Sequence, residues 1–131
     1  MINEVIQLKK DIKKRIAPLV HRVGIDVEEV GRFRELDFLH DGLYQKIFTD
    51  KEKAYCMSKR DPYPHFAARF AAKEAVAKAI GVSVFKLKDI EIMNESTGRP
   101  KAVIHSQPKI NVEISLSHTK DRAAAIAIWL C

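Results

Sequence analysis

Cysteine is scarce in this sequence. The chain has 131 residues and two cysteines, Cys56 and Cys131, which are too few for a framework of disulfide bonds and lack the paired spacing of a zinc site. We therefore expect both thiols to be reduced and to have a structural role.

Long hydrophobic runs are also absent. No apolar stretch approaches the roughly 20 residues that a transmembrane helix needs, and the first 20 residues lack the continuous apolar segment of a secretion signal. The length suits one domain. We expect a cytoplasmic protein that does not enter the membrane, with a basic amphipathic extension at residues 1–20 and a single domain at residues 21–131.

Common motifs of phosphate binding and nucleophilic catalysis are missing too. The sequence contains no glycine-rich phosphate loop and no nucleophile elbow. If the protein binds phosphate, basic side chains and a metal ion must hold it.

The chain is basic, with a formal net charge of +6. Residues 1–22 carry six basic and two acidic side chains, a balance of +4, whereas residues 23–131 have a balance of only +2. An excess of this sign suits an anionic partner, which could be a nucleic acid, an acidic protein or a phosphorylated small molecule. Charge alone does not choose among these partners.

Helical patterns dominate the first part of the chain. Residues 3–20 place Val5, Leu8, Ile12 and Ile16 at helical spacing and predict a short amphipathic helix that ends near Pro18. Residues 21–26 predict a short strand, and the apolar spacing from Val27 to residue 36 predicts another helix.

Two further helices follow. Thr49 and Glu52 form a capping box, which predicts a helix that runs to about residue 59. The strongest helical pattern covers residues 65–80 and ends at Gly81, a typical helix C-cap.

The pattern changes after Gly81. Residues 88–94 and 101–105 predict strands, residues 110–117 alternate apolar and polar side chains with a period of two, and residues 122–130 predict a more buried last strand. These elements together predict an α+β fold, in which helices pack on an antiparallel sheet and the late strands form a meander.

The helix at residues 65–80 carries charge beside small apolar residues. At about 100° per residue, Glu74 and Lys78 lie beside a row of alanines, and Arg69 projects to the other side. Small alanines allow a ligand or another backbone to approach, so this pair is a candidate site. The alternative is an ordinary i,i+4 ion pair, worth about 0.2–0.5 kcal/mol.

Two more polar residues lie at the ends of predicted strands. Asp26 ends an apolar strand, where it can face a cleft, but it also forms a helix-capping pair with Glu29. His118 ends the strand before a turn; its near-neutral pKa makes it available for proton or phosphate contacts, although a structural hydrogen bond would also explain it.

Five motifs occur in an order typical of one enzyme family. They are Gly24-Ile25-Asp26-Val27 with Glu29 and Arg32, followed by Ile47-Phe48-Thr49 with Glu52; Arg69-Phe70-Ala71-Ala72-Lys73-Glu74-Ala75 with Lys78 and Gly81; Asp89-Ile90-Glu91-Ile92; Gly98-Arg99-Pro100; and Ser115-Leu116-Ser117-His118-Thr119. Between about residues 23 and 128 the chain therefore resembles the holo-acyl-carrier-protein synthases, the short trimeric type of the 4′-phosphopantetheinyl transferase superfamily.

The resemblance implies a transfer of 4′-phosphopantetheine from coenzyme A to a serine of an apo acyl carrier protein. In the family pattern, the residues at Asp26 and Glu74 hold Mg²⁺, an ion that prefers oxygen ligands and substrate phosphate. Lys78 would neutralise the pyrophosphate, and Glu74, Lys78 and His118 would take part in catalysis. A magnesium-ordered water or a carboxylate such as Glu74 would accept the serine proton.

The same resemblance assigns the nucleotide of coenzyme A to a second group of residues. Arg69 would hold its phosphates, with Lys59 or Arg60 as further candidates, and Pro100 would border the adenine. His118 and Thr119 belong to the last motif, whose histidine also contacts the nucleotide.

The family pattern also implies protein partners. Arg32 and Arg34 would meet the acidic carrier protein, although exposed arginines are common on any helix. A homotrimer would place Asp26 and Glu74 of one subunit opposite His118 of its neighbour. The lysine-rich extension at residues 1–20 departs from the short family members.

Two other functions are compatible with parts of the sequence. The basic charge and the late strands would suit a small nucleic-acid-binding domain, but the strands lack the interleaved aromatic and basic residues of a base-stacking surface. A carrier-binding relative without activity is the other alternative, and the presence of Asp26, Glu74, Lys78 and His118 argues against it.

Overall fold

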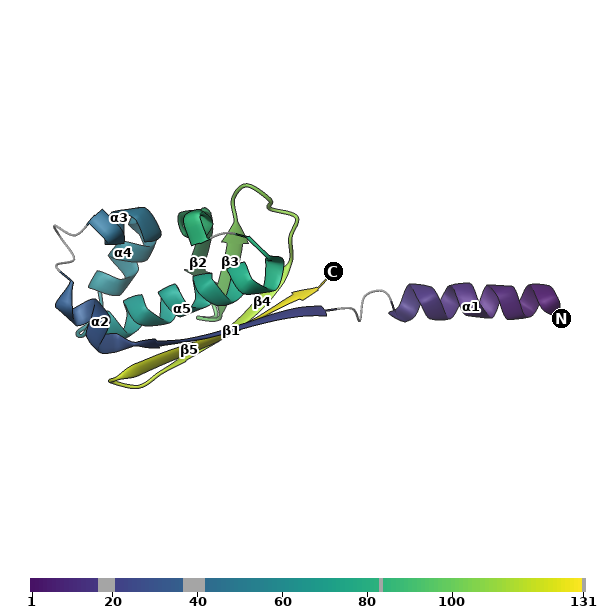
Figure 1. Cartoon of the computed structure of the whole chain (residues 1–131), viewed down its shortest axis with the longest axis horizontal. Helices are drawn as coiled ribbons and strands as arrows, with labels where there is room; N and C mark the ends of the chain where they lie inside the picture. Colours follow the sequence, from purple (N-terminus) through teal and green to yellow (C-terminus); the bar gives the residue numbers. More distant parts are fainter. Residues whose placement is uncertain (17–20, 37–41, 83, 131) are drawn as a thin grey trace.

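A long central helix organises the protein. The computed structural model describes residues 1–16, 21–36, 42–82 and 84–130. Helix α5 (Tyr63–Ile80) lies between a three-stranded sheet on one side and a layer of short helices and a hairpin on the other (Figure 1). The remaining elements are α1 (Ile2–Ile16), β1 (His21–Glu29), α2 (Val30–Glu35), α3 (Gly42–Ile47), α4 (Asp50–Met57), the 3₁₀ helix η2 (Val84–Asp89), β2 (Ile90–Asn94), β3 (Pro100–Ile104), β4 (Val112–His118) and β5 (Arg122–Leu130).

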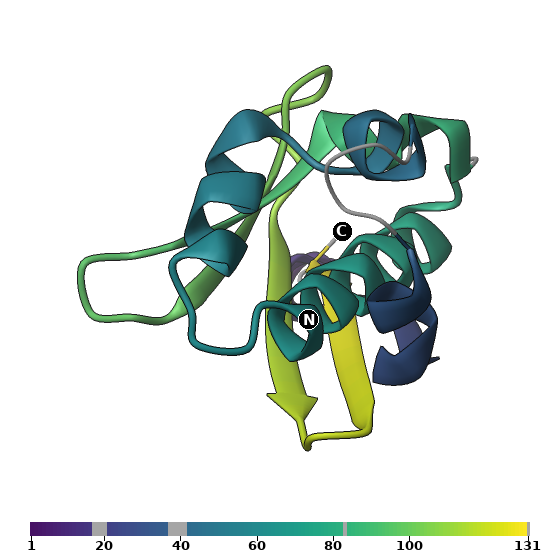
Figure 2. The same ribbon diagram turned by 90° about the vertical axis from the view of Figure 1, so that its left-hand side faces the viewer.

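The α+β class is confirmed, but the strands do not form one late meander. The three-stranded sheet has the order β1-β5-β4, and β2 with β3 forms a separate antiparallel hairpin (Figure 2). The first strand therefore pairs with the last, which places Asp26 beside Ala125. Apolar periodicity had identified the strands but not their partners, because it reports burial and not pairing.

Strand β1 is longer than expected. It continues to Glu29, and α2 begins only at Val30 without a side-chain cap. The predicted helix from Val27 and the capping role of Asp26 are therefore wrong. In a strand alternate residues share a face, so Asp26 and Glu28 both turn toward α5.

The packing of α5 on β1 depends on small residues. The helix buries a row of alanines, and Gly24 of β1 lies so close to it that a Cβ atom would be 1.9 Å from the Ala75 carbonyl oxygen. Gly81 ends the helix in the left-handed region, with φ 79°, as predicted. This close approach fixes the distance between β1 and the charged residues of α5.

A buried ion pair joins α5 to α4 and the hairpin. Lys73 has no exposed surface; its Nζ lies 2.7 Å from Oε1 of Glu52 and donates to the carbonyl oxygens of Leu87 and Ile90. Glu52 also completes the predicted capping box with Thr49. Burial outweighs the carboxylate in lowering the pKa of Lys73.

Cys56 has no exposed surface and is a free thiol. Burial raises its pKa to about 12, so it is not a nucleophile at neutral pH. Cys131 lies outside the described residues. Within the described part of the chain, no helix is long and apolar enough to cross a bilayer.

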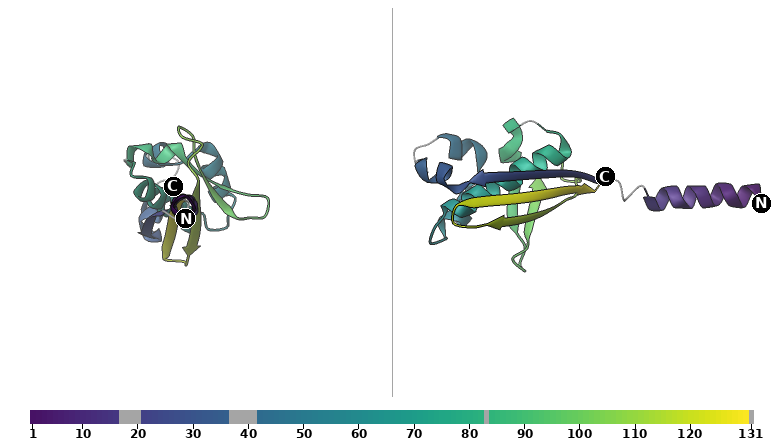
Figure 3. Two further views of the ribbon diagram at one scale, coloured as in Figure 1. Left: turned by 90° about the vertical axis from the view of Figure 1, so that its right-hand side faces the viewer. Right: turned by 60° about the horizontal axis from the view of Figure 1, so that its bottom comes forward.

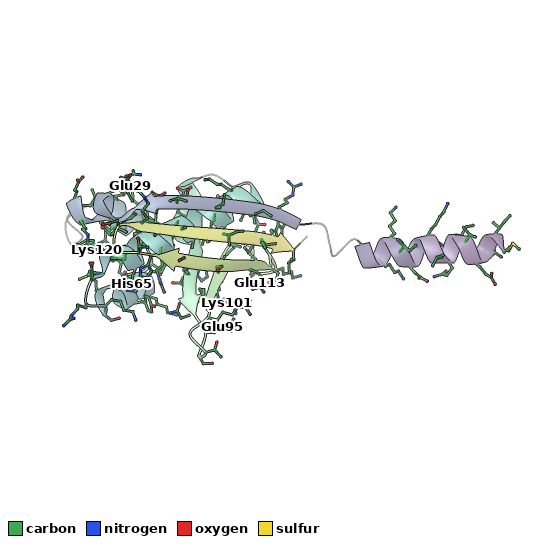
Figure 4. The ribbon with its side chains drawn as sticks, turned by 90° about the horizontal axis from the view of Figure 1, so that it is seen from below. Glu29, His65, Glu95, Lys101, Glu113 and Lys120 are labelled. Carbon is green, nitrogen blue, oxygen red and sulfur yellow. The ribbon has the colours of Figure 1, made fainter. Side chains whose placement is uncertain are left out.

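The face of the sheet opposite α5 is apolar along β1 and β5, and no described residue covers it there. Val23, Ile25 and Val27 of β1 are 59–63% exposed, and they pair across the sheet with Ile128, Ile126 and Ala124 of β5. Figure 4 looks onto this face. Helix α1 lies apart from the folded body, beyond the start of β1 (Figures 1 and 3).

Candidate functional site

Asp26 and Lys78 meet where β1 passes under the end of α5. The Lys78 Nζ lies 3.2 Å from Asp26 Oδ1 and donates to the Ile25 carbonyl oxygen at 3.0 Å. The second carboxylate oxygen, Asp26 Oδ2, is buried and, while Glu28 is ionised, has no hydrogen-bond donor among the described residues. A buried oxygen without a partner is costly, so this geometry favours a bound cation or donor.

Two glutamates surround Asp26. Burial raises the pKa of Glu28 to about 7; a side-chain hydrogen bond with Asp26, repulsion by Asp26 and, more weakly, repulsion by Glu74 add to this, while Arg32 opposes it. Burial also raises the pKa of Glu74, with Asp26 as a further cause and Lys78 opposing. The three carboxyl groups therefore repel one another, and a cation between them would relieve the repulsion.

This acidic group, Asp26, Glu28 and Glu74, fits Mg²⁺. Among the described residues no three His, Cys, Asp or Glu side chains converge closely enough to hold a metal by themselves. Magnesium does not require such a set, because it keeps several waters and commonly takes one or two carboxylates together with substrate phosphate. The unpartnered Asp26 Oδ2 and the mutual repulsion of the carboxyl groups favour such a cation.

A cationic group gathers around Tyr55. The Arg69 guanidinium carbon lies 3.7 Å from the centre of the Tyr55 ring, and Lys59 Nζ lies 4.6 Å from it. Arg69 Nη2 reaches Asn94 Oδ1 at 3.4 Å, while its Nε is buried and has no hydrogen-bond partner in the described part of the chain. Arg69 is thus held in place by stacking and keeps an unsatisfied buried donor.

Two histidines extend this cationic group. The rings of His65 on α5 and His118 on β4 lie 4.9 Å apart at 68°. Burial is the main cause that lowers the pKa of His65, with His118, Lys59 and Arg69 adding to it. An anion would therefore be favoured here, since it would offset several nearby positive charges.

The other two residues predicted to bind the nucleotide, Pro100 and Thr119, have different surroundings. Pro100 begins β3, pairs with Asn94, and lines a hollow of about 310 Å³ with residues of β3 and of the segment before β4. The Thr119 hydroxyl accepts hydrogen bonds from the backbone N–H groups of Asp121 and Arg122, so it shapes the β4–β5 turn.

The two arginines predicted to meet the carrier differ in their contacts. Arg34 donates to both carboxylate oxygens of Asp61, at 3.0 and 2.5 Å, and this interaction lowers the pKa of Asp61. Arg32 is 71% exposed and has only a long 3.4 Å contact with Glu28. Arg32 therefore has the freer guanidinium.

An apolar groove adjoins the acidic group. Its volume is about 720 Å³, and Glu74 lies on its wall; its other lining residues are Leu43, Gln45, Lys46, Ile47, Phe70, Leu87 and Lys88. The groove is open at the surface between α3, α5 and η2. It can receive a flexible, largely uncharged chain attached to the charged group that binds beside Glu74.

The acidic and cationic groups lie on opposite sides of α5. Asp26 belongs to β1 and His118 to β4, which are the two edge strands of the sheet with β5 between them. Lys78 contacts the first edge and His65 the second. One chain therefore presents two half-sites that face different directions.

The prediction from sequence missed Glu28, His65 and Tyr55. Glu28 was hidden because residues 27–29 were assigned to a helix; the alternation of a longer strand would have placed it beside Asp26. No local pattern marked His65 or Tyr55, because their role depends on the contact of α4 and β4 with the start of α5.

Comparison with known proteins identifies the family. Residues 22–127 match the model of the 4′-phosphopantetheinyl transferase superfamily. The chain is 42% identical to the holo-[acyl-carrier-protein] synthase of Chlamydia caviae, over 82% of this chain and 95% of the relative. It is 44% identical to that of Chlamydia pneumoniae, over 86% and 98%.

A solved structure gives the same result. The holo-(acyl-carrier-protein) synthase of Bacillus anthracis, solved in complex with CoA (3′,5′-ADP), has a TM-score of 0.71 and 30% identity, and the match covers 82% of this chain and 94% of that one. Asp26, Glu74 and Lys78 belong to the shared motifs and lie close together in the fold. These matches show that the chain belongs to the 4′-phosphopantetheinyl transferase superfamily, and within it to the holo-[acyl-carrier-protein] synthases.

Proposed function

We propose that this chain transfers 4′-phosphopantetheine from coenzyme A to a serine of an apo acyl carrier protein, as needed for fatty-acid biosynthesis in the cytoplasm. The serine oxygen forms a bond to the β-phosphorus of the pyrophosphate, the bond from that phosphorus to the bridging oxygen breaks, and adenosine 3′,5′-bisphosphate leaves. The observation that carries the proposal is the pair of unpartnered buried atoms, Asp26 Oδ2 and Arg69 Nε. One favours a cation and the other an anion, which together correspond to Mg²⁺ and a phosphorylated substrate.

The acidic half-site would perform the transfer. Asp26 and Glu74 would hold Mg²⁺, which supplies charge neutralisation of the pyrophosphate when it is bound. Lys78 would donate to the same pyrophosphate from its position beside Asp26. The serine proton would pass to Glu74 or to a water next to it.

The cationic half-site would bind the nucleotide. Arg69, His118 and Lys59 would contact its phosphates, with Pro100 at the adenine and Thr119 shaping the turn that carries His118. The apolar groove beside Glu74 would take the pantetheine arm, because a flexible and mostly uncharged chain suits its walls.

We further propose that each complete site forms between two subunits of a homotrimer. The half-sites of one chain point away from each other, so a single substrate would reach the acidic half of one subunit and the cationic half of its neighbour. The uncovered apolar face of β1 and β5 supports such an assembly, since exposed apolar surface of this kind marks protein interfaces.

The acidic carrier protein would approach beside the acidic half-site. Arg32 would form the main contact, and Arg34, held by Asp61, would add positive charge next to it. Such contacts set the orientation and the rate of association more than the affinity.

Mass spectrometry of the carrier tests the reaction. Purified protein, coenzyme A, Mg²⁺ and an apo acyl carrier protein should yield a carrier heavier by one phosphopantetheine. Glu74→Gln should nearly abolish the product while the fold is retained, whereas the exposed Asp50→Asn serves as a matched control with normal activity. Absence of the mass shift with fatty-acid and polyketide carriers alike would refute the proposal.

A further inference from the structure

Helix α1 has an apolar side that nothing in the described chain covers. Val5, Leu8 and Ile12 are 51%, 58% and 45% exposed, although all three project from one side of the helix. The helix lies beyond the folded body in each side view (Figures 1 and 3). An isolated helix of 15 residues is marginal in water, so this apolar side needs a partner.

The residues of α1 follow a coiled-coil pattern. The intervals of three and four residues place Val5 and Ile12 at a positions and Leu8 at a d position, which together form a short apolar seam. Ile2 and Ile16 fall at e positions beside this seam, and Arg15 occupies the next d position. Lys10 lies almost opposite this seam, at about 100° per residue. Ile6 and Ile2 lie outside the central seam.

The two borders of the seam carry opposite charges. Glu4 and Asp11 fall at g positions on one border, and Lys9 falls at an e position on the other, with Lys13 beyond it. In parallel helices the g border of one faces the e border of its neighbour, so Glu4 of one copy would meet Lys9 of the next. In antiparallel helices the like-charged borders would face each other.

We propose that α1 packs in parallel against the α1 helices of neighbouring copies of this chain. The seam is short, with two a residues and one d residue fully described, and would be weak between free peptides. Attachment to assembled bodies raises the local concentration of the helices to about the millimolar range. In isolated peptides, β-branched a residues with Leu at d favour two-stranded coiled coils. In this chain the helices are attached to folded bodies, so the assembly of those bodies sets the number of helices that meet.

The charge pattern also argues against other partners for this side. A helix that binds an anionic membrane surface carries basic residues along both borders of its apolar face. Here Glu4 and Asp11 occupy one border, and Asp11 accepts a hydrogen bond from Gln7 at 3.0 Å. An acidic carrier protein would meet the same repulsion along that border.

The position of α1 in the chain supports self-association. The helix precedes β1, whose outward face of Val23, Ile25 and Val27 is also apolar and uncovered. Copies that meet through this sheet face would bring their α1 helices near one another. One assembly would then bury both apolar surfaces of the N-terminal segment.

Disulfide cross-linking of the full chain tests the proposal. In a Cys131→Ser background, where Cys56 is buried, Leu8→Cys should form covalent dimers under mild oxidation at least about tenfold faster than the matched control Lys10→Cys. Equal rates for the two variants, or no cross-linking of Leu8→Cys, would overturn the proposal.

A charge-exchange cycle tests the parallel pairing. In the Leu8→Cys background, Glu4→Lys and Lys9→Glu should each slow cross-linking, and the double variant should restore the rate; a double variant as slow as the singles would overturn the pairing.

Sedimentation with phosphatidylglycerol vesicles, with no cross-linking, would identify a membrane helix instead. Transfer to the carrier, measured in the same variants, should stay at the wild-type level, which separates failure of this proposal from failure of the proposed function.

Discussion

Glu28 makes the stability of the protein depend on pH in a direction unusual for a carboxylate. Its pKa is raised from 4.5 to about 7, chiefly by burial and by Asp26. The folded state therefore binds the proton more tightly than the unfolded state does. The resulting stabilisation is fully present below pH 4.5 and is lost as the pH rises through 7.

The magnitude follows from that rise. At about 1.36 kcal/mol per pH unit, a change from 4.5 to about 7 corresponds to an upper limit of about 3 kcal/mol. Water that reaches the acidic group screens part of this effect, which leaves about 2 kcal/mol. Glu28→Gln mimics the protonated side chain, so this variant should match the wild type at pH 4.5 and exceed its free energy of unfolding by about 2 kcal/mol at pH 8.

Urea denaturation of both proteins across this pH range, in EDTA, provides the measurement. The part-buried contact between Glu28 and Arg32 is lost in the variant, but at 3.4 Å it is long and contributes little. Addition of Mg²⁺ should narrow the difference at pH 8, because the cation stabilises the charged wild-type group. Parallel stability curves for the two proteins would refute the assignment of Glu28 to a buried acidic group.

Three further predictions concern the packing and the cationic half-site. Gly24→Ala places a methyl group against the Ala75 carbonyl oxygen and should lower the free energy of unfolding by about 1–3 kcal/mol and reduce transfer; an unchanged melting curve would contradict this. Lys73→Met leaves the Glu52 carboxylate buried without its cation and should cost about 3–5 kcal/mol in chemical denaturation, so a loss below about 1 kcal/mol would show that the ion pair is dispensable. Arg69→Lys loses the planar stacked guanidinium and should raise the KM for coenzyme A, whereas an equal KM would place the nucleotide elsewhere.

Local signals in the sequence were sufficient for several elements. The capping box at Thr49 and Glu52 and the glycine cap at Gly81 both occur as predicted, because each depends only on residues within a few positions. The last strand also has its predicted bounds, Arg122–Leu130.

The end of β1 could not be predicted locally. Val27, Val30 and Phe33 have the spacing of a helix, but the backbone at residues 27–29 pairs with Ala124, Ala123 and Arg122 of a strand nearly one hundred residues later. This pairing decides the conformation, and no property of the segment itself reveals it. The same error concealed the position of Glu28 beside Asp26.

The site was predictable in its residue types but not in its layout. The motifs brought together Asp26, Glu74 and Lys78, and the structure places them near one another. The separation of Arg69 and His118 onto the other side of α5 depends on the sheet order β1-β5-β4. The helical projection had put Arg69 on the other side of the helix, and the family resemblance had put His118 of a neighbouring subunit opposite Asp26. The position of His118 on the far edge of its own sheet results from long-range pairing, which no local pattern reveals.

Complementation between inactive variants tests most directly whether the two half-sites of neighbouring subunits form one active site. Glu74→Gln removes the acidic half and Arg69→Ala the cationic half, and each variant alone should be nearly inactive in the carrier mass-shift assay. Random mixing of their subunits by denaturation and refolding should restore about a quarter of the wild-type sites, because a head-to-tail interface combines an intact acidic half with an intact neighbouring cationic half in that proportion. Activity no higher than that of the separate variants would contradict the account and would place each complete site within a single chain.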